Sequence, residues 1–204
     1  MSSDVKGVSQ MSDEDRRRDR VRELLPELQQ ISDEGLRDAV TEIWLKAWIE
    51  SGWEDMAAVP KNPSATKAAA SVEDAWTLIT HTRVVAQVAA ASADIVAKLH
   101  GTAYDLDTVI ALALLHDVSK LLEYEGTESS VSKSRFGELI QHGVYGAFLA
   151  WQQDLPVEIV HGIIAHTPSS RSAPRTQEAL IVRYADFIST DTLLLDVGEK
   201  LFIA

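Results

Sequence analysis

Four histidines and two aspartates between residues 81 and 186 are the side chains of this chain best suited to bind metal and do chemistry. They are His81, His116, Asp117, His142, His166 and Asp186. The chain has no cysteine, which excludes disulfides, thiolate catalysis and cysteine-ligated clusters. Any bound metal must therefore be held by imidazole and carboxylate, a ligand set that suits Mn, Fe, Co, Ni, Zn or Mg.

The dipeptide His116-Asp117 is the most informative part of this set. It interrupts an apolar stretch that runs from Val109 to Leu115 and resumes at Leu121. An ionised aspartate buried without partners costs several kcal/mol, and a divalent cation offsets that cost. A carboxylate has two oxygens, so Asp117 can bridge two ions while the adjacent imidazole binds one. An internal hydrogen bond between the two side chains is the alternative interpretation.

The elements that must position these residues are helices, each predicted from apolar spacing and end signals. The expected helices run from Ser71 to His100-Gly101, from Asp105 or Asp107 to about Tyr124, from Phe136 to Gln152, from Pro156 through Ile164, and from about Glu178 to Leu195. Each candidate ligand lies on or at the end of a different helix, the adjacent pair excepted. Helices packed around a common axis can direct such side chains to one point.

The rest of the chain also favours an all-α fold, because Gly and Pro are sparse and strands are hard to place. Residues 1–20 are polar and indicate a disordered tail that runs into a helix start at Ser12. Residues 21–70 form an N-terminal helical extension, in which Pro26 can split one helix and Gly52 ends another. Residues 71–204 form the main helical domain. Residues 54–70, 126–134 and 167–176 are expected to be loops.

Charge and hydropathy narrow the classes of partner. The formal charge of −12 and the lack of a Lys/Arg-rich run that spans a face argue against a nucleic acid polymer. A metal site can reverse the potential locally, so a small phosphorylated substrate stays compatible with an acidic chain. No apolar stretch approaches the roughly 20 residues of a membrane span, and the N-terminus lacks a hydrophobic signal region. We therefore expect no membrane partner and a cytoplasmic location.

The ordered pattern H…HD…H…H…D resembles the HD superfamily of metal-dependent phosphohydrolases. The motifs are His81-Thr82-Arg83, HDVSK at residues 116–120, HGVYG at 142–146, His166-Thr167-Pro168 and Asp186, and the resemblance covers about residues 72–195. It implies an HD-domain helical bundle. The phrases HGVYGAFLA and IIAHTP are most similar to bacterial HD hydrolases that split dinucleoside polyphosphates. This chain lacks the GYP element and the adjacent histidine pair that are typical of the HD-family enzymes acting on cyclic dinucleotides.

The resemblance also implies a role for each ligand. His81, His116, Asp117 and Asp186 would hold one divalent ion, and Asp117 would bridge to a second ion bound by His142 and His166. Iron and manganese are the foremost candidates. A water between two such cations is acidified and attacks phosphorus, while the ions neutralise charge on the phosphoryl oxygens. The expected activity is hydrolysis of a phosphoric ester or anhydride in a nucleotide or other small phosphorylated metabolite.

Four basic residues are candidates for contact with substrate. Lys120 could polarise the water or hold a phosphate oxygen. The alternative is a lysine at an amphipathic boundary that extends its ammonium group into solvent and has no role in the site. Arg83 is close to His81 in sequence, and Arg171 and Arg175 in the loop after His166 could clamp a distal phosphate. The alternative for all three arginines is simple solvation.

Two other functions use the same ligands. Some HD-family proteins hold di-iron and use dioxygen to cleave C–C or C–P bonds, and a metal-stabilised regulatory module would bind a ligand without turnover. Trp44 and Trp48 share the apolar stripe of the helix that ends at Gly52, and together with Trp53 they are expected to lie in the core or at an interface. A buried interface at this helix would support a homodimer.

Overall fold

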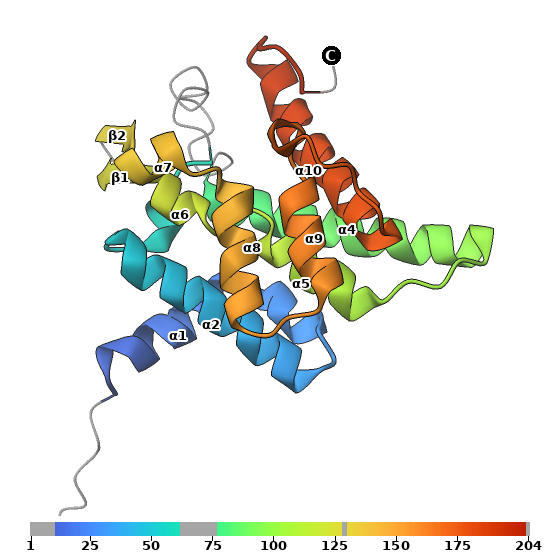
Figure 1. Ribbon diagram of the computed structural model, residues 1–204, viewed down its shortest axis with the longest axis horizontal. Coiled ribbons are helices and arrows are strands. Elements are labelled where there is room, and N and C mark those ends of the chain that lie inside the picture. Colours follow the sequence, from blue (N-terminus) through green and yellow to red (C-terminus); the bar gives the residue numbers. More distant parts are fainter. Residues whose placement is uncertain (1–10, 62–76, 128–129, 203–204) are drawn as a thin grey trace, which may run out of the picture.

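The computed structural model describes residues 11–61, 77–127 and 130–202, and in these ranges the chain folds into helices with one small hairpin (Figure 1). The α-helices are α1 (Asp13–Leu24), α2 (Glu34–Ser51), α4 (Leu78–His100), α5 (Leu106–Leu115), α6 (Lys120–Glu123), α7 (Arg135–Leu139), α8 (His142–Gln152), α9 (Val157–Ala165) and α10 (Gln177–Asp196). Short 3-10 turns are η1 (Pro26–Gln30), η2 (Met56–Ala58) and η4 (Pro168–Ser170), and the strands are β1 (Tyr124–Thr127) and β2 (Ser130–Lys133). The expected all-α fold is confirmed.

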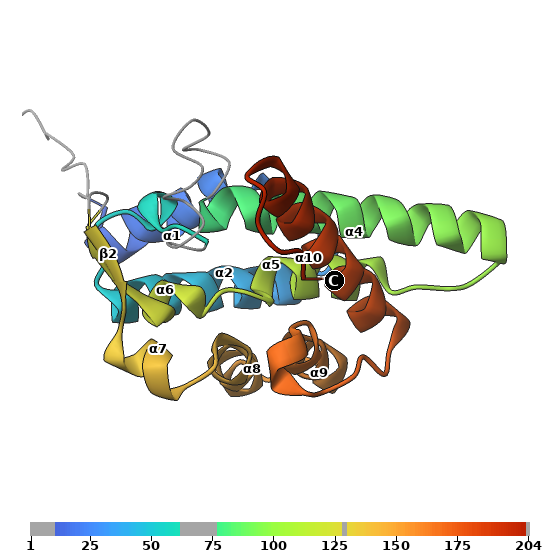
Figure 2. The ribbon, with the colours of Figure 1, turned by 90° about the horizontal axis from the view of Figure 1, so that it is seen from above.

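Helix α5 forms the centre of the molecule. Its side chains from Thr108 to Leu115 are all buried, so it is apolar on every face, as expected of a helix surrounded by others. It packs against α4 on one side and α9 on the other, with α2 and α10 also in contact. Figure 2 shows the resulting layers, with α4 above, α2, α5 and α6 in the middle, and α7, α8 and α9 below.

The N-terminal extension joins the same hydrophobic core. Trp44 and Trp48 are 0% and 4% exposed. The Trp44 indole N–H donates to the carbonyl of Leu114 in α5 at 2.9 Å, and that of Trp48 donates to the carbonyl of Trp53 at 2.8 Å. Of the two expectations for these tryptophans, the core is therefore confirmed, because their side chains are buried and hydrogen-bonded inside one chain. A homodimer stays a prediction without this support.

Several expected helix ends are confirmed and have clear causes. Ser12 accepts a hydrogen bond from the Asp15 amide at the start of α1, and Gly52 ends α2 with a φ of 76°, a left-handed conformation that glycine adopts without cost. Pro26 separates α1 from η1. The tail was expected to extend to residue 20, but α1 begins at Asp13, and residues 1–10 lie outside the described ranges. Helix α4 is capped by Thr77; Ser71 lies outside the described residues.

The helix expected from Asp105 to about Tyr124 is instead two helices separated by a turn. Asp105 caps α5 through the Thr108 amide, and α5 ends at Leu115. The turn is closed by tight bonds from the Val118 amide to the Leu115 carbonyl at 3.1 Å and from the Lys120 amide to the Asp117 carbonyl at 2.9 Å. In a continuous helix, adjacent side chains point about 100° apart. The turn lets His116 and Asp117 face the same centre.

Two further expectations are corrected in the region that follows. The loop expected at residues 126–134 contains an antiparallel hairpin, in which Gly126 pairs with Val131 and Tyr124 with Lys133. The helix expected over Phe136–Gln152 is broken at residues 140–141. The break places His142 at the first position of α8. Within the described ranges no helix is long and apolar enough to cross a membrane.

Candidate metal centre

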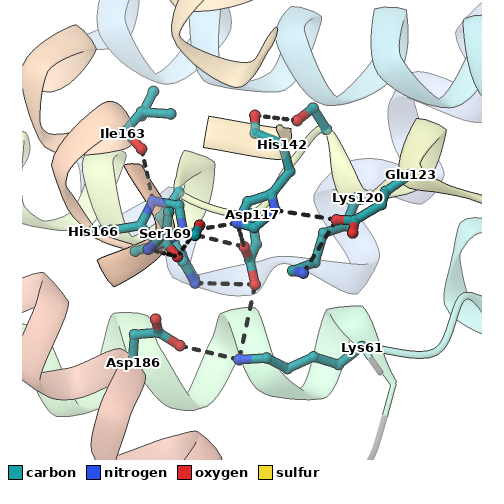
Figure 3. A network of polar contacts seen from close by, with 12 residues as sticks. Lys61, Asp117, Lys120, Glu123, His142, Ile163, His166, Ser169 and Asp186 are labelled. Carbon is teal, nitrogen blue, oxygen red and sulfur yellow. Dashed lines mark hydrogen bonds and ion pairs between the residues drawn. The ribbon is translucent and has the colours of Figure 1, made fainter. Parts of the chain in front are cut away.

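All six candidate ligands meet in the interior, although they come from five separate regions of the chain. His81 lies in α4 and Asp186 in α10, His116 and His166 directly follow α5 and α9, and His142 opens α8. His116 is 0% exposed and His142 is partly buried. The other four ligands are 9% exposed or less: His81, Asp117, His166 and Asp186. Figure 3 shows Asp117 at the centre of the cluster, with His142 and His166 on one side and Asp186 beyond the other.

The first ligand group, which we name the α4 position, consists of His81, His116 and Asp117. Ligand atoms of these three residues lie within 4.8 Å of one another. The Nε2 atoms of His81 and His116 are 3.1 Å apart, and each lies 3.5 Å from Asp117 Oδ2. Asp186 Oδ1 is 3.3 Å from His81 Nε2 and adds a second carboxylate to this group.

The second group, which we name the α8 position, consists of Asp117, His142 and His166. Their ligand atoms also lie within 4.8 Å of one another. The two Nε2 atoms are 3.2 Å apart and lie 3.3 and 3.4 Å from Asp117 Oδ1. Asp117 therefore directs one oxygen to each position, which is the arrangement that a bridging carboxylate requires.

Hydrogen bonds fix how the imidazoles present their nitrogens. His116 Nδ1 is 2.7 Å from the Ala113 carbonyl, and His166 Nδ1 is 2.7 Å from the Ile163 carbonyl. Both acceptors belong to the last turn of the preceding helix, where carbonyls lack helical partners. A carbonyl can only accept, so Nδ1 carries the proton and Nε2 keeps its lone pair toward the centre. Metal-ligating histidines are commonly oriented in this way.

Electrostatics keep these groups in the protonation state that metal binding needs. Burial lowers the pKa of His116 from its ordinary 6.5 to about 3, so its imidazole is neutral near pH 7. Burial alone would raise the pKa of both aspartates. The positive charge of Lys120 nevertheless holds the pKa of Asp117 well below its usual range, and that of Lys61 does the same for Asp186. The neutral imidazole of His116 and the ionised carboxylates of Asp117 and Asp186 fit a divalent cation.

Two residues of the site were not singled out from the sequence. Glu123 Oε2 lies 3.1 Å from His142 Nδ1 and 3.4 Å from Lys120 Nζ. Lys61 Nζ lies 3.0 Å from Asp186 Oδ1, on the other side of the cluster. The three-residue spacing of Lys120 and Glu123 on one short helix is a signal that could have revealed Glu123. Lys61 lies in an irregular segment and carries no such signal.

The four residues expected to contact substrate have different surroundings. Lys120 is buried beside the cluster, and Asp117 raises its pKa although burial opposes this. The guanidinium of Arg83 is paired with the buried carboxylate of Glu27, at 3.0 and 3.2 Å. Arg171 and Arg175 are exposed in the segment after His166. Of the four, Lys120 is the one whose charge is found to act on a candidate ligand, Asp117, and substrate contact by any of the four stays a prediction.

His161 of α9 has a structural role, because it binds the segment that follows His166. Its Nε2 accepts a hydrogen bond from the Arg175 amide at 3.0 Å, which ties the segment to α9. Arg183 of α10 adds a second tie, because its Nη1 donates to the carbonyls of Ala165 and Ser172 at 3.2 and 3.4 Å.

In this helical bundle, histidines from several helices lie around a shared aspartate. This arrangement defines a class of metal-binding hydrolase domain. The HD domain family matches residues 78–191, more than half of the chain, within the region expected from the motifs. The chain belongs to the HD domain family, and it is a metal-dependent hydrolase of phosphoric ester bonds.

The chain is also similar to a protein with a named activity. The chain is 29% identical over 189 residues to a dihydroneopterin 2′,3′-cyclic phosphate phosphodiesterase of Methanocaldococcus jannaschii. The similarity covers 84% of this chain and 69% of that protein. No solved structure matches the chain significantly.

Proposed function

We propose that the chain is a dinuclear phosphodiesterase that hydrolyses a small, nucleotide-like phosphorylated metabolite, with cyclic phosphates as the leading substrate class. The observation that carries this proposal is the position of Asp117, whose two oxygens face two separate pairs of histidines. One carboxylate shared between two triads is what two adjacent cations require. A single ion would leave one triad unused.

The residues divide between the two positions as the family resemblance implies. His81, His116, Asp117 and Asp186 would hold one ion, and Asp117, His142 and His166 the other. When bound, two divalent ions supply an activated water and neutralise charge on the phosphoryl oxygens. Iron and manganese are the leading candidates for both ions.

The protein's own residues add orientation and charge. The buried ammonium of Lys120 lies next to the α8 position, where it can donate a hydrogen bond to a phosphoryl oxygen as negative charge develops there. Glu123 accepts from Lys120 at 3.4 Å and so limits the directions in which this ammonium can point. Lys120 therefore acts by holding and stabilising the phosphoryl group.

The preference for a cyclic phosphate comes from the relative, whose printed name is that of a phosphodiesterase for such a substrate. The formal charge of −12 supports a small substrate over a nucleic acid polymer, because a polyanion would meet repulsion over a large area. Dinucleoside polyphosphates, indicated by the motif phrases, are the second substrate class to test.

A substrate panel with defined metal loading tests the proposal. The purified chain is stripped with chelator, reloaded with Mn²⁺ or Fe²⁺, and incubated with 2′,3′-cyclic nucleotides, pterin cyclic phosphates, dinucleoside polyphosphates and phosphomonoesters. Phosphorus NMR then reports which bond is opened. We expect ring opening of a cyclic phosphate to a monoester, and no reaction with Asp117→Asn. A fully loaded protein that hydrolyses no member of the panel would refute the proposal.

The same samples separate the two other functions. Stripped protein is also loaded with Mg²⁺ or Zn²⁺, which are redox-silent, and turnover with either ion contradicts an oxygenase. Oxygen uptake by the Fe²⁺-loaded protein with an organic substrate would instead establish one. Stoichiometric metal with no turnover and no oxygen uptake would instead indicate a regulatory module.

A further inference from the structure

We infer that the two metal positions are unequal, with the α8 position binding its ion tightly and Lys61 competing with the ion at the α4 position. This inference rests on the proposed dinuclear site, and it concerns the order and strength of metal binding rather than the reaction. It is carried by two separate sets of contacts, one on each side of Asp117.

Lys61 directs its ammonium group into the α4 position. The residue is 7% exposed, and its Nζ lies 2.5 Å from His81 Nε2, 3.0 Å from Asp186 Oδ1 and 3.8 Å from Asp117 Oδ2. Thr190 Oγ1 accepts a further hydrogen bond from Nζ at 2.6 Å. Figure 3 shows the Lys61 side chain extended between Asp186 and Asp117.

These contacts use the atoms that a metal would need. A divalent ion binds imidazole nitrogen and carboxylate oxygen at about 2.0–2.2 Å, so it would lie among His81 Nε2, Asp117 Oδ2 and Asp186 Oδ1. An ammonium in the same space would be in contact with the ion, and two positive charges at that separation repel strongly. Binding of the ion therefore requires Nζ to leave, and the ion must replace contacts that Lys61 already makes.

The α8 position is built differently. Glu123 lies behind His142, with its carboxylate 3.1 Å from Nδ1, so that Nε2 is directed at Asp117. A carboxylate behind a ligating imidazole fixes its orientation and makes it a stronger ligand. The nearby cation, Lys120, lies 3.4 Å from Glu123 and has its charge balanced there. At the α8 position, therefore, Glu123 orients His142, and the ammonium of Lys120 is paired with Glu123 rather than with a metal ligand.

Metal titration of chelator-stripped protein tests the inference without any substrate. Mn²⁺ is added to the wild type, and free Mn²⁺ is measured by its electron paramagnetic resonance. We expect one tight and one weak equivalent. Lys61→Gln and Lys61→Met should strengthen the weak equivalent by roughly tenfold or more, because the competing charge is gone. Glu123→Ala should weaken the tight equivalent by about 10- to 100-fold.

Matched variants distinguish competition from a general change in charge or folding. Lys98→Gln removes one positive charge from α4 at an exposed residue that pairs with Asp94, and it should leave both affinities unchanged. Lys61→Arg keeps the charge and should not strengthen the weak equivalent. A purely structural lysine would give the opposite result for Lys61→Gln, namely weaker binding with lower thermal stability in both metal-free and metal-loaded protein.

Failure of the inference is distinguishable from failure of the proposed function. Two equivalents of equal affinity in the wild type, or a weak equivalent that Lys61→Gln does not strengthen, would overturn the inference while leaving a dinuclear enzyme intact. Binding of fewer than two equivalents at saturating Mn²⁺ would refute the dinuclear site itself.

Discussion

Asp117 is the residue on which both metal positions depend. Because one carboxylate oxygen faces each pair of histidines, Asp117→Asn replaces one of the two oxygens with a nitrogen that cannot bind metal and removes the negative charge. We expect less than one retained metal equivalent and activity lower by about a thousandfold or more, since metal ions contribute several kcal/mol to phosphoryl transfer. Elemental analysis and a phosphodiesterase assay measure the two effects.

The control for Asp117→Asn is Asp107→Asn. Asp107 is also an aspartate with a lowered pKa, but it accepts from the backbone amides of Ser32 and Asp33 at 2.9 and 2.8 Å, away from the metal ligands. The Asp107→Asn variant should lose stability and keep its metal. Full metal content in Asp117→Asn would contradict the bridging role.

His116 gives the metal-free protein a specific sensitivity to acid. Burial lowers its pKa in the folded protein to about 3, against 6.5 in the unfolded chain. Between these values the unfolded chain binds a proton that the folded protein does not, so stability falls as the pH drops from about 6.5 toward 3. The loss is on the order of several kcal/mol, at about 1.4 kcal/mol per pKa unit.

Urea unfolding of chelated protein between pH 7.5 and 4.5 measures this acid sensitivity. His116→Gln cannot titrate, and we expect its stability to depend less steeply on pH in this window. Bound metal should make the wild-type curve steeper, because a proton and an ion compete for the same Nε2 and acid therefore also removes the stability that the metal adds. A wild-type stability that is unchanged down to pH 4.5 would show that His116 is not the sensitive group.

At the scale of elements, the close packing of α8 on α9 sets the separation of His142 and His166. A Cβ built on Gly143 would lie 3.0 Å from the Ile163 carbonyl oxygen, and that oxygen also lies 2.7 Å from His166 Nδ1. Gly143→Ala therefore presses on the group that orients a ligand, and backbone cannot rotate aside as a side chain can. We expect a loss of about 1–3 kcal/mol in unfolding free energy and weaker binding at the α8 position.

Gly35→Ala is the matched control for this element-scale change. Gly35 is an exposed glycine in the first turn of α2, where a Cβ would lie 3.3 Å from Asp33 Oδ1, so Gly35→Ala alters a helix start away from the ligands and should leave Mn²⁺ affinity unchanged. Thermal unfolding and Mn²⁺ titration of both variants provide the comparison. Equal Mn²⁺ affinity in Gly143→Ala and the wild type would mean that α8 and α9 can separate without disturbing the histidines.

Sequence patterns were enough to predict the helices and to single out six side chains that the structure gathers in one cluster, but they did not predict the breaks between the helices. Apolar periodicity extends across Leu115 and Leu121 and across residues 140–141, so it cannot show that tight turns interrupt these stretches. The breaks are stabilised by tertiary contacts, such as the Ser119 hydroxyl that donates to the His142 carbonyl. Lys61 was beyond prediction for a related reason: its partners His81, Asp186 and Thr190 are distant in sequence and are gathered only by the packing of α10 on α4.

At the scale of the whole molecule, the hydrophobic core does not depend on the metal site for its continuity. One cluster of buried side chains extends from Val21 and Leu25 near α1, through α5, to Ala185 in α10. The site lies within this cluster but replaces only a small part of it. The helices should therefore stay formed without metal, unlike those of small domains in which metal binding and folding are the same event.

Removal of metal should consequently lower the stability of a protein that stays folded. An ion that binds only the folded state at 100 times its dissociation constant contributes about 2.7 kcal/mol. For a chain of 204 residues this corresponds to roughly 5–11 °C in melting temperature, at about 2–4 °C per kcal/mol. Circular dichroism should show the same helical signal at 20 °C before and after chelation, and calorimetry should show the lower transition, restored by Mn²⁺.

Lys61→Gln should show a larger gain in melting temperature on metal loading than the wild type. Its metal-free form has lost the cation that pairs with Asp186, while its loaded form has lost a competitor of the ion. Loss of the helical signal on chelation would mean that the buried histidines and aspartates, rather than the apolar core around α5, hold the layers together.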